Sequence, residues 1–182
     1  ASQTKQKLVP FGEYLPGGES FPFLRDWLPN TRRYLPGDEL NLFPGVDGSS
    51  ILAAICYDIG FEPILKKALE SGVRVVWNPV NDGWFPSSMA AWHKALAQFR
   101  SAEMGLPLIR VSNSGYSVIA DDRGVVLQTG EWDQSVAKRV TIPVPEHAGP
   151  WLHIAEIFRL AMLGWALLDV GLGLLLRRSQ ED

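Results

Sequence analysis

The sequence has few cysteines, little net charge and few histidines, so it lacks the usual signals of a disulfide-stabilised, nucleic-acid-binding or metal-binding protein. It contains a single cysteine in 182 residues, Cys56, so no internal disulfide can form. Its 17 basic and 20 acidic residues give a net charge of -3, and no basic stripe indicates nucleic-acid binding. Its three histidines, His93, His147 and His153, lack metal-ligand spacing with a nearby cysteine. We therefore interpret them as structural or surface residues and expect no metal and no cofactor.

The beginning of the chain lacks the charged-then-apolar pattern of a signal peptide. The chain starts at Ala1 and enters a motif almost immediately, and no internal repeat is visible. We therefore expect the C-terminal part of a longer protein, with one globular domain of ordinary composition and an apolar tail.

Cys56 follows a short apolar run, residues 51–55, and polar residues come soon after it. This pattern is typical of a buried parallel strand that ends at a site, where open α/β sheets place their reactive groups. The residues alone leave two interpretations open, a small core side chain or a reactive thiol. Of these, core packing is the more common for a free cysteine.

The chain after residue 50 alternates between strand and helix patterns. We expect strands at 51–56, 73–79, 108–112, 116–120, 125–129 and 136–142, and helices at 62–71 and 88–104. The second helix is expected to bury a stripe of Ala91, Ala95, Leu96, Phe99 and Ala102. Strands that alternate with helices and then form hairpins indicate a layered α/β sandwich.

Residues 15–48 hold many of the prolines and glycines and show little periodicity. So long a stretch is uncommon in a compact domain unless it is functional, and we interpret it as a lid-like loop. It carries the apolar cluster Phe21, Phe23, Leu24, Trp27 and Leu28. This cluster either packs on the domain or dips into a bilayer surface, where aromatic side chains are favoured.

Residues 151–177 are mostly apolar. Between Arg159 and Arg177 lie 17 residues, about the minimum for a membrane span. We predict a transmembrane helix over 151–177 and, from the positive residues at its end, a cytoplasmic tail over 178–182. The alternative is an amphipathic helix packed on the domain or lying in the interface, because Asp169 within a span costs about 3 kcal/mol.

Several ordered motifs carry a family resemblance. They are Leu8-Val9-Pro10-Phe11-Gly12-Glu13-Tyr14, Ile55-Cys56-Tyr57, Asn81-Asp82-Gly83-Trp84-Phe85, and the series Arg100, Glu103, Pro107-Leu108, Arg110, Asn113, Gly115. In these motifs the chain resembles the nitrilase, or carbon–nitrogen hydrolase, superfamily, and within it the apolipoprotein N-acyltransferase family. The resemblance covers nearly the whole chain. It implies a nitrilase-like layered α-β-β-α sandwich over 1–148, incomplete at its N-terminus, followed by one transmembrane helix.

The resemblance also implies roles for individual residues. Cys56 is the nucleophile that takes the acyl group as a thioester, and Lys5 helps to stabilise the tetrahedral oxyanion. Lys7 is adjacent but falls at a variable position, so we prefer Lys5. Glu13 orients the site, and the backbone N–H of Tyr57 is the second oxyanion donor. Trp84 and Phe85 either line the acyl pocket or belong to the core, and Phe21, Phe23 and Trp27 of the 15–48 loop are candidates for the same lipid or acyl pocket.

Two departures from the family are visible. Asp58 stands where the family usually has glutamate, which shortens the reach of the carboxylate by one methylene and leaves its role open. The general-base glutamate of the family lies upstream of the lysine, and no candidate precedes Lys5 here. We therefore expect this chain to be inactive alone.

The function implied is acyl transfer at a bacterial inner membrane, in a multi-pass protein with its catalytic domain on the periplasmic side. A fatty acyl chain would move from a membrane phospholipid through the Cys56 thioester to the α-amine of a diacylglyceryl-cysteine lipoprotein. The expected partners are these two substrates and the lipid bilayer, and no nucleic acid. The alternatives are a nitrilase-type amidase that hydrolyses carbon–nitrogen bonds and a catalytically inactive, membrane-attached remnant.

Overall fold

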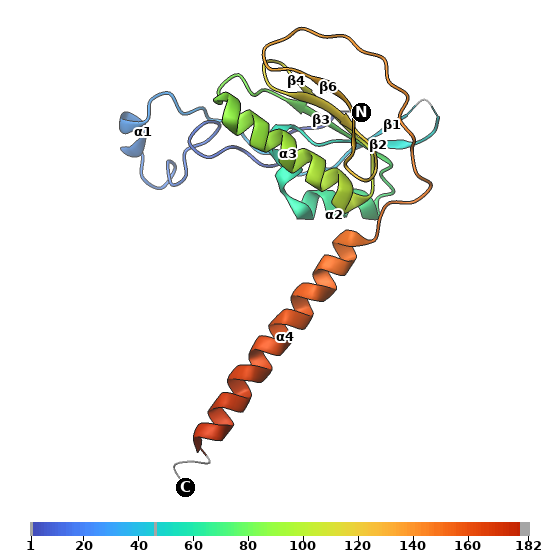
Figure 1. Ribbon diagram of the computed structural model, residues 1–182. Helices are drawn as coiled ribbons and strands as arrows, with labels where there is room; N and C mark the ends of the chain where they lie inside the picture. The colour runs from blue at the N-terminus through green and yellow to red at the C-terminus, as the bar shows by residue number, and fades with distance from the viewer. Residues whose placement is uncertain (1, 46, 179–182) are drawn as a thin grey trace. The chain divides into compact units, whose positions relative to one another are not determined.

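The computed structural model describes residues 2–45 and 47–178. One compact unit ends at Gly149 and a second begins at Pro150. The first unit contains one mixed sheet with strand order β1-β2-β3-β4-β5-β6 (Figure 1). These strands are β1 (Leu42–Pro44), β2 (Ser50–Ala53), β3 (Val75–Val80), β4 (Leu108–Ser112), β5 (Ser117–Ala120) and β6 (Val126–Gly130).

The centre of the sheet is parallel and its flanks are antiparallel. Strand β3 runs parallel to both β2 and β4, whereas β1, β5 and β6 pair antiparallel with their neighbours. The carboxyl ends of β2, β3 and β4 therefore meet at one edge of the sheet. Parallel sheets place their ligand sites at this edge, and Cys56 follows β2 there.

One face of the sheet is covered by helices. The 3-10 helix η1 (Cys56–Gly60) leads into α2 (Glu62–Glu70), and α3 (Ser87–Met104) connects β3 to β4 (Figure 1). The paired residues Leu52, Val76, Leu108 and Ala120 form a row across four strands, and each is 0% exposed. Full burial of a leucine or valine side chain stabilises a fold by roughly 1.5–3 kcal/mol, so this row is the centre of the core.

The predicted helices at 62–71 and 88–104 are confirmed, but the buried face of α3 differs from the expected stripe. Ala95 and Phe99 are exposed, and the helix instead buries Ala90, His93, Ala97, Ser101 and Met104. These positions share one helical face, and their mostly small side chains let the helix approach the sheet closely. Two of them are polar and have polar partners inside the unit, which a hydrophobic pattern does not reveal.

The strand predicted at 136–142 is wrong. Residues 134–145 have no regular structure and follow the last sheet strand without pairing to it. This segment contains Pro143 and Pro145, which have no N–H to donate to a strand partner. Val136, Val140, Ile142 and Val144 line shallow cavities together with residues of the sheet, so the segment contacts the sheet through side chains.

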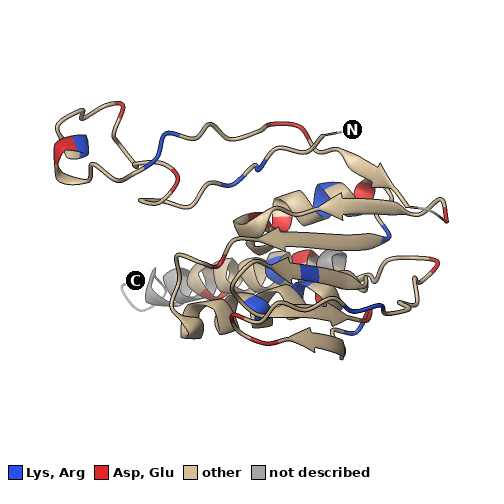
Figure 2. Ribbon diagram, turned by 90° about the horizontal axis from the view of Figure 1, so that it is seen from above, with Lys and Arg blue, Asp and Glu red and all other residues tan. Residues whose placement is uncertain are grey.

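The segment 15–48 is largely irregular, as expected, but it contains the short helix α1 (Leu24–Trp27) and ends in strand β1. Phe21 and Phe23 are each 55% exposed and Trp27 is 78% exposed. Figure 2 shows the part around α1 standing apart from the sheet. Of the two interpretations of this aromatic cluster, packing on the domain does not fit these exposed side chains, and contact with a bilayer surface stays a prediction.

The expected α-β-β-α sandwich is present in part, because the described residues form one sheet and one helical layer. The second unit holds α4 (Trp151–Arg178), which covers the helix predicted at 151–177. No helix within residues 2–45 and 47–178 combines the length and apolar character needed to cross a membrane. From residue 179 on, the predicted cytoplasmic tail lies outside the described residues.

Candidate active site

The cysteine occupies a strained turn at the end of a central strand. Strand β2 ends at Ala53, and Cys56 is the first residue of η1 with a backbone φ of 51°. A left-handed φ is uncommon for a residue with a Cβ, and such residues cluster at active sites when the surrounding structure holds them. A strand–turn–helix of this kind presents its nucleophile at the sheet edge. Cys56 is free and partly buried.

The surroundings of Cys56 favour the protonated form of its thiol. Burial raises the pKa of the thiol, and the positive charge of Lys5 and a backbone hydrogen bond from Asn81 only partly oppose this effect. The negative charges of Asp82 and Glu13 raise the pKa further. Because only the thiolate is a good nucleophile, attack by Cys56 requires a base that takes its proton.

Lys5 and Glu13 form a close ion pair beside the cysteine. The Nζ atom of Lys5 lies 2.7 Å from Oε1 and 2.6 Å from Oε2 of Glu13, and the two side chains are only 13% and 9% exposed. The backbone N–H of Val9 donates a further hydrogen bond to Glu13, at 2.8 Å. Glu13 therefore fixes the position of the Lys5 ammonium, and its orienting role in catalysis stays a prediction.

The three predicted catalytic side chains line one cavity of about 630 Å³. Cys56, Lys5 and Glu13 share its wall with the loop aromatics Trp84 and Phe85, whose rings stack with centroids 6.5 Å apart. Trp84 is 45% exposed, so its interpretation as a core residue is wrong. The cavity is thus a pocket in which an acyl chain could contact aromatic surface beside a thiol.

Asp58 connects the lysine segment to the nucleophile turn. Its buried carboxylate accepts hydrogen bonds from the backbone N–H of Lys7, at 2.7 Å, and of Gln6, at 3.2 and 3.3 Å. Burial raises the pKa of Asp58, and these hydrogen bonds offset part of that effect. These contacts connect Asp58 to residues that lie 51 and 52 positions earlier in the chain. They give a structural role to Asp58, whose role the sequence left open.

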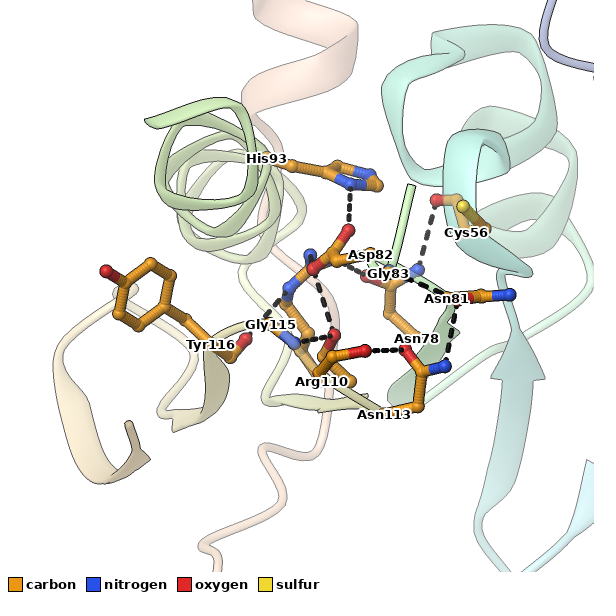
Figure 3. A network of polar contacts seen from close by, with 12 residues as sticks. Cys56, Asn78, Asn81, Asp82, Gly83, His93, Arg110, Asn113, Gly115 and Tyr116 are labelled. Carbon is orange, nitrogen blue, oxygen red and sulfur yellow. Dashed lines mark hydrogen bonds and ion pairs between the residues drawn. The ribbon is translucent and has the colours of Figure 1, made fainter. Parts of the chain in front are cut away.

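A buried polar network supports the same turn from the other side (Figure 3). Asn78 on β3 donates from Nδ2 to the carbonyls of Ala54, at 2.6 Å, and Cys56, at 3.2 Å. Its Oδ1 accepts a hydrogen bond of 2.7 Å from Nη1 of Arg110, the residue paired with Asn78 across β3 and β4. The backbone of the nucleophile turn is therefore held by an amide that is itself oriented by a buried guanidinium.

The guanidinium of Arg110 is neutralised by Asp82 at the end of β3. Arg110 Nη2 lies 2.7 Å from Asp82 Oδ2, and both side chains are 0% exposed. Asp82 also accepts a hydrogen bond from Ser112, at 3.0 Å, and lies 3.2 Å from Nδ1 of His93. Burial alone would raise the pKa of Asp82, but His93, Arg110 and Ser112 outweigh it and lower the pKa. Burial lowers the pKa of Arg110, and Asp82 opposes that effect.

Close packing around Asp82 explains one glycine of the motif series. A Cβ added at Gly115 would collide with the Asp82 carboxylate and with the Ser112 hydroxyl. The backbone N–H of Gly115 also donates a 2.9 Å hydrogen bond to that hydroxyl. Only glycine fits here without displacing the ion pair.

The predicted loop aromatics Phe21, Phe23 and Trp27 do not line the cysteine cavity. Tyr57 contributes to a neighbouring cavity, while its backbone N–H, the group predicted to act, directly follows Cys56 in the turn. Sequence reasoning gave no role to Asn78 and Arg110, or to Arg32 and Tyr34 on the cavity wall. Asn78 and Arg110 could have been found as polar residues that interrupt otherwise apolar strand segments. Nothing in the sequence pattern of the 15–48 loop distinguished Arg32 and Tyr34.

The mixed sheet with a cysteine on a tight turn after a central parallel strand is a nitrilase-like α/β fold. A solved structure of this fold is a variant of the amidase from Nesterenkonia sp. AN1, described with the acetamide moiety of fluoroacetamide added at its active-site cysteine. It matches with a TM-score of 0.51 over 71% of this chain and 45% of that chain, at 19% identity, and shows the fold alone. Residues 3–142 match the carbon-nitrogen hydrolase family. The chain belongs to this family.

Curated relatives narrow the likeness within the family. The chain is 32% identical to the apolipoprotein N-acyltransferase of Pasteurella multocida, over 96% of this chain and 34% of that protein. It is 35% identical to the apolipoprotein N-acyltransferase of Haemophilus influenzae, over 68% of this chain and 24% of that protein. The chain thus spans about a quarter to a third of the length of these relatives.

Proposed function

We propose that this chain carries the nucleophile of an apolipoprotein N-acyltransferase. The observation that carries the proposal is that Cys56, on a left-handed turn, opens into the same cavity as the Lys5–Glu13 pair and two stacked aromatic rings. The names of the curated relatives support the reaction class. Cys56, Lys5 and Glu13 are the residues to which we assign the chemistry.

In the first step, Cys56 Sγ attacks an ester carbonyl of a membrane phospholipid. A carbon–sulfur bond forms, the ester carbon–oxygen bond breaks, and a lysophospholipid leaves with the proton that a base took from the thiol. The Lys5 ammonium and the backbone N–H of Tyr57 stabilise the tetrahedral oxyanion. Glu13 is the one carboxylate on the described wall of the cavity, and it is held by Lys5 and Val9. The family resemblance assigns the base to a glutamate upstream of Lys5.

In the second step, the α-amine of a diacylglyceryl-cysteine attacks the thioester. A carbon–nitrogen bond forms, the carbon–sulfur bond breaks, and the proton lost by the amine returns to Cys56 through the base. A thioester suits this reaction because it reacts readily with amines and persists when water is kept out. The aromatic wall formed by Trp84 and Phe85 supports that exclusion.

The exposed aromatic segment around α1 supports action at a bilayer surface. Phe21, Phe23 and Trp27 stand free of the core and are suited to the membrane interface. We keep the membrane span over 151–177 and a periplasmic catalytic domain at the inner membrane as part of the proposal. The partners are then the phospholipid donor, the lipoprotein acceptor and the bilayer.

The test is a two-substrate transfer assay on the full-length protein in detergent. A phospholipid with a labelled acyl chain and a peptide bearing an N-terminal diacylglyceryl-cysteine are supplied together. Label should appear in the peptide as an amide, and Cys56→Ala should abolish it. Ammonia release from small amides without acyl transfer would contradict the proposal in favour of the amidase, and inactivity toward both classes would favour the remnant.

A further inference from the structure

A second cavity, of about 540 Å³, lies next to the cysteine cavity and is lined by cations. Its charged lining residues are Lys7, Arg25, Arg32, Arg33 and Glu19. Arg25 is paired with Glu19, so three positive charges remain without a carboxylate partner in the lining. We call this space the cationic cavity. Its charge favours an anionic ligand.

The three cations differ in how they are held. Arg32 donates a 2.7 Å hydrogen bond from Nη1 to the Tyr34 hydroxyl, and its guanidinium lies 5.6 Å from the ring centroid of Trp84. Lys7 Nζ lies 5.5 Å from the ring centroid of Phe61. Arg33 is exposed and has no hydrogen bond, ion pair or ring contact within the part of the chain that the structure describes. Arg32 therefore shapes the wall, while Arg33 keeps its guanidinium for a ligand, and a guanidinium matches phosphate oxygens well.

Most of the remaining lining of the cationic cavity is apolar or aromatic. Leu8, Leu15, Leu35 and Phe61 contribute to it, and Leu35 is 89% exposed. A small hydrophilic anion gains nothing from such surface, whereas an amphiphile with an anionic head and an apolar body contacts both kinds of lining. The combination favours a lipid phosphate over free phosphate.

The two cavities are neighbours along the chain and in space. Pro10, Arg32 and Tyr34 line both of them. Cys56 lines the first cavity, and the next residue, Tyr57, lines the second. In a glycerophospholipid, the phosphate and the ester carbonyls are attached to the same glycerol. A molecule of this class can therefore present its ester to Cys56 while its phosphate occupies the adjacent space.

We infer that the cationic cavity binds the phosphate of the glycerophospholipid acyl donor, with Arg33 and Lys7 as its ligands. This inference rests on the proposed function and adds to it a location for the head group. It assigns substrate binding to residues that line the cationic cavity and not the cysteine cavity, among them residues 33, 35 and 36 of the irregular loop together with residues 7 and 8.

The test compares two acyl donors in the full-length protein. Dioleoyl phosphatidylglycerol in detergent micelles carries a phosphate, and the p-nitrophenyl ester of a short fatty acid does not. For Arg33→Gln, the KM for the phospholipid should rise about tenfold more than the KM for the phosphate-free ester, since one charge-assisted hydrogen bond is lost. Lys7→Gln should act in the same direction. The matched control Arg139→Gln removes an equal charge from an exposed residue that lines neither cavity, and it should leave both KM values unchanged.

Each alternative result has a distinct meaning. If Arg33→Gln behaves like Arg139→Gln while the wild type is acylated by phospholipid, the inference fails and the proposed function stands. If the wild type is acylated by neither donor, the proposed function itself fails. Equal losses with both donors would show an effect on the cysteine site and overturn the phosphate assignment. Inorganic phosphate that competes as tightly as the lipid would assign the cavity to free phosphate and also overturn it.

Discussion

Replacing Arg110 with methionine removes the cation that neutralises Asp82 in the buried network. The guanidinium and the carboxylate are 2.7 Å apart and both are fully buried, so Arg110→Met leaves a negative charge without its partner in the interior. The change also removes the hydrogen bond that orients Asn78, which holds the carbonyls of Ala54 and Cys56. Both stability and the position of the nucleophile should therefore suffer.

The magnitude follows from the burial of the pair. Removing one partner of a buried ion pair costs about 3–5 kcal/mol, because the remaining charge keeps its desolvation penalty and loses its compensation. Domains are stable by only about 5–15 kcal/mol, so the loss is a large share of the total. Asp82→Asn should cost a similar amount, since it leaves the Arg110 charge buried instead.

The assay is a double-mutant cycle on the full-length protein. The free energy of unfolding is obtained from the urea dependence of proteolysis within residues 2–149. Each single variant should lose about 3 kcal/mol or more, and the double variant Arg110→Met/Asp82→Asn should lose less than the sum by at least about 2 kcal/mol. Single losses below about 1 kcal/mol, or strictly additive losses, would refute the reasoning that the pair compensates a desolvation cost.

Three further predictions concern the site and its support. Lys5→Met should raise the pKa of Cys56, because the lysine charge lowers it. Iodoacetamide should then alkylate the thiol more slowly near pH 8, and an unchanged alkylation rate would show that the Lys5 charge does not act on the thiol. Asp58→Ala removes the carboxylate that holds the lysine segment and should reduce kcat by roughly tenfold or more, with a smaller loss in Asp58→Asn, and equal kcat in all three proteins would contradict the anchoring role. The pKa of Asp82 is lowered in the folded state, so the stability it contributes is present above its unfolded pKa of about 3.9 and is lost as the pH falls through the lower folded value. The stability gap between wild type and Asp82→Asn should therefore narrow below about pH 4, and a gap independent of pH would count against it.

Local patterns predicted most of the regular structure. The helices at 62–71 and 88–104 and the strand at 108–112 carry strong periodicity and turn signals, and they form within about one residue of the expected bounds. Strand β1 has only three residues and ends in Pro44, so its sequence carries almost no strand signal. The failure at 136–142 shows that residues with high strand propensity need not form a strand, because this segment contacts the sheet through its side chains and its backbone does not pair with the edge strand β6.

The site was predictable only in part. Cys56, Lys5 and Glu13 came from ordered motifs that resemble a family, since nothing in their spacing shows that these side chains meet. The contacts that hold the site join residues far apart in the chain. Asp58 reaches Lys7 across 51 positions and Arg110 reaches Asn78 across 32. Such pairings depend on the strand register and on the path of the loop, which periodicity cannot supply.

Intact-mass spectrometry can show whether Cys56 carries the acyl group during the reaction. Full-length protein is incubated with phospholipid without an acceptor, and its mass is measured before and after treatment with hydroxylamine, which cleaves thioesters. We expect one fatty-acyl mass increase that maps to Cys56, disappears with hydroxylamine and is absent in Cys56→Ala. An unmodified Cys56 in protein that still transfers acyl chains would contradict this expectation.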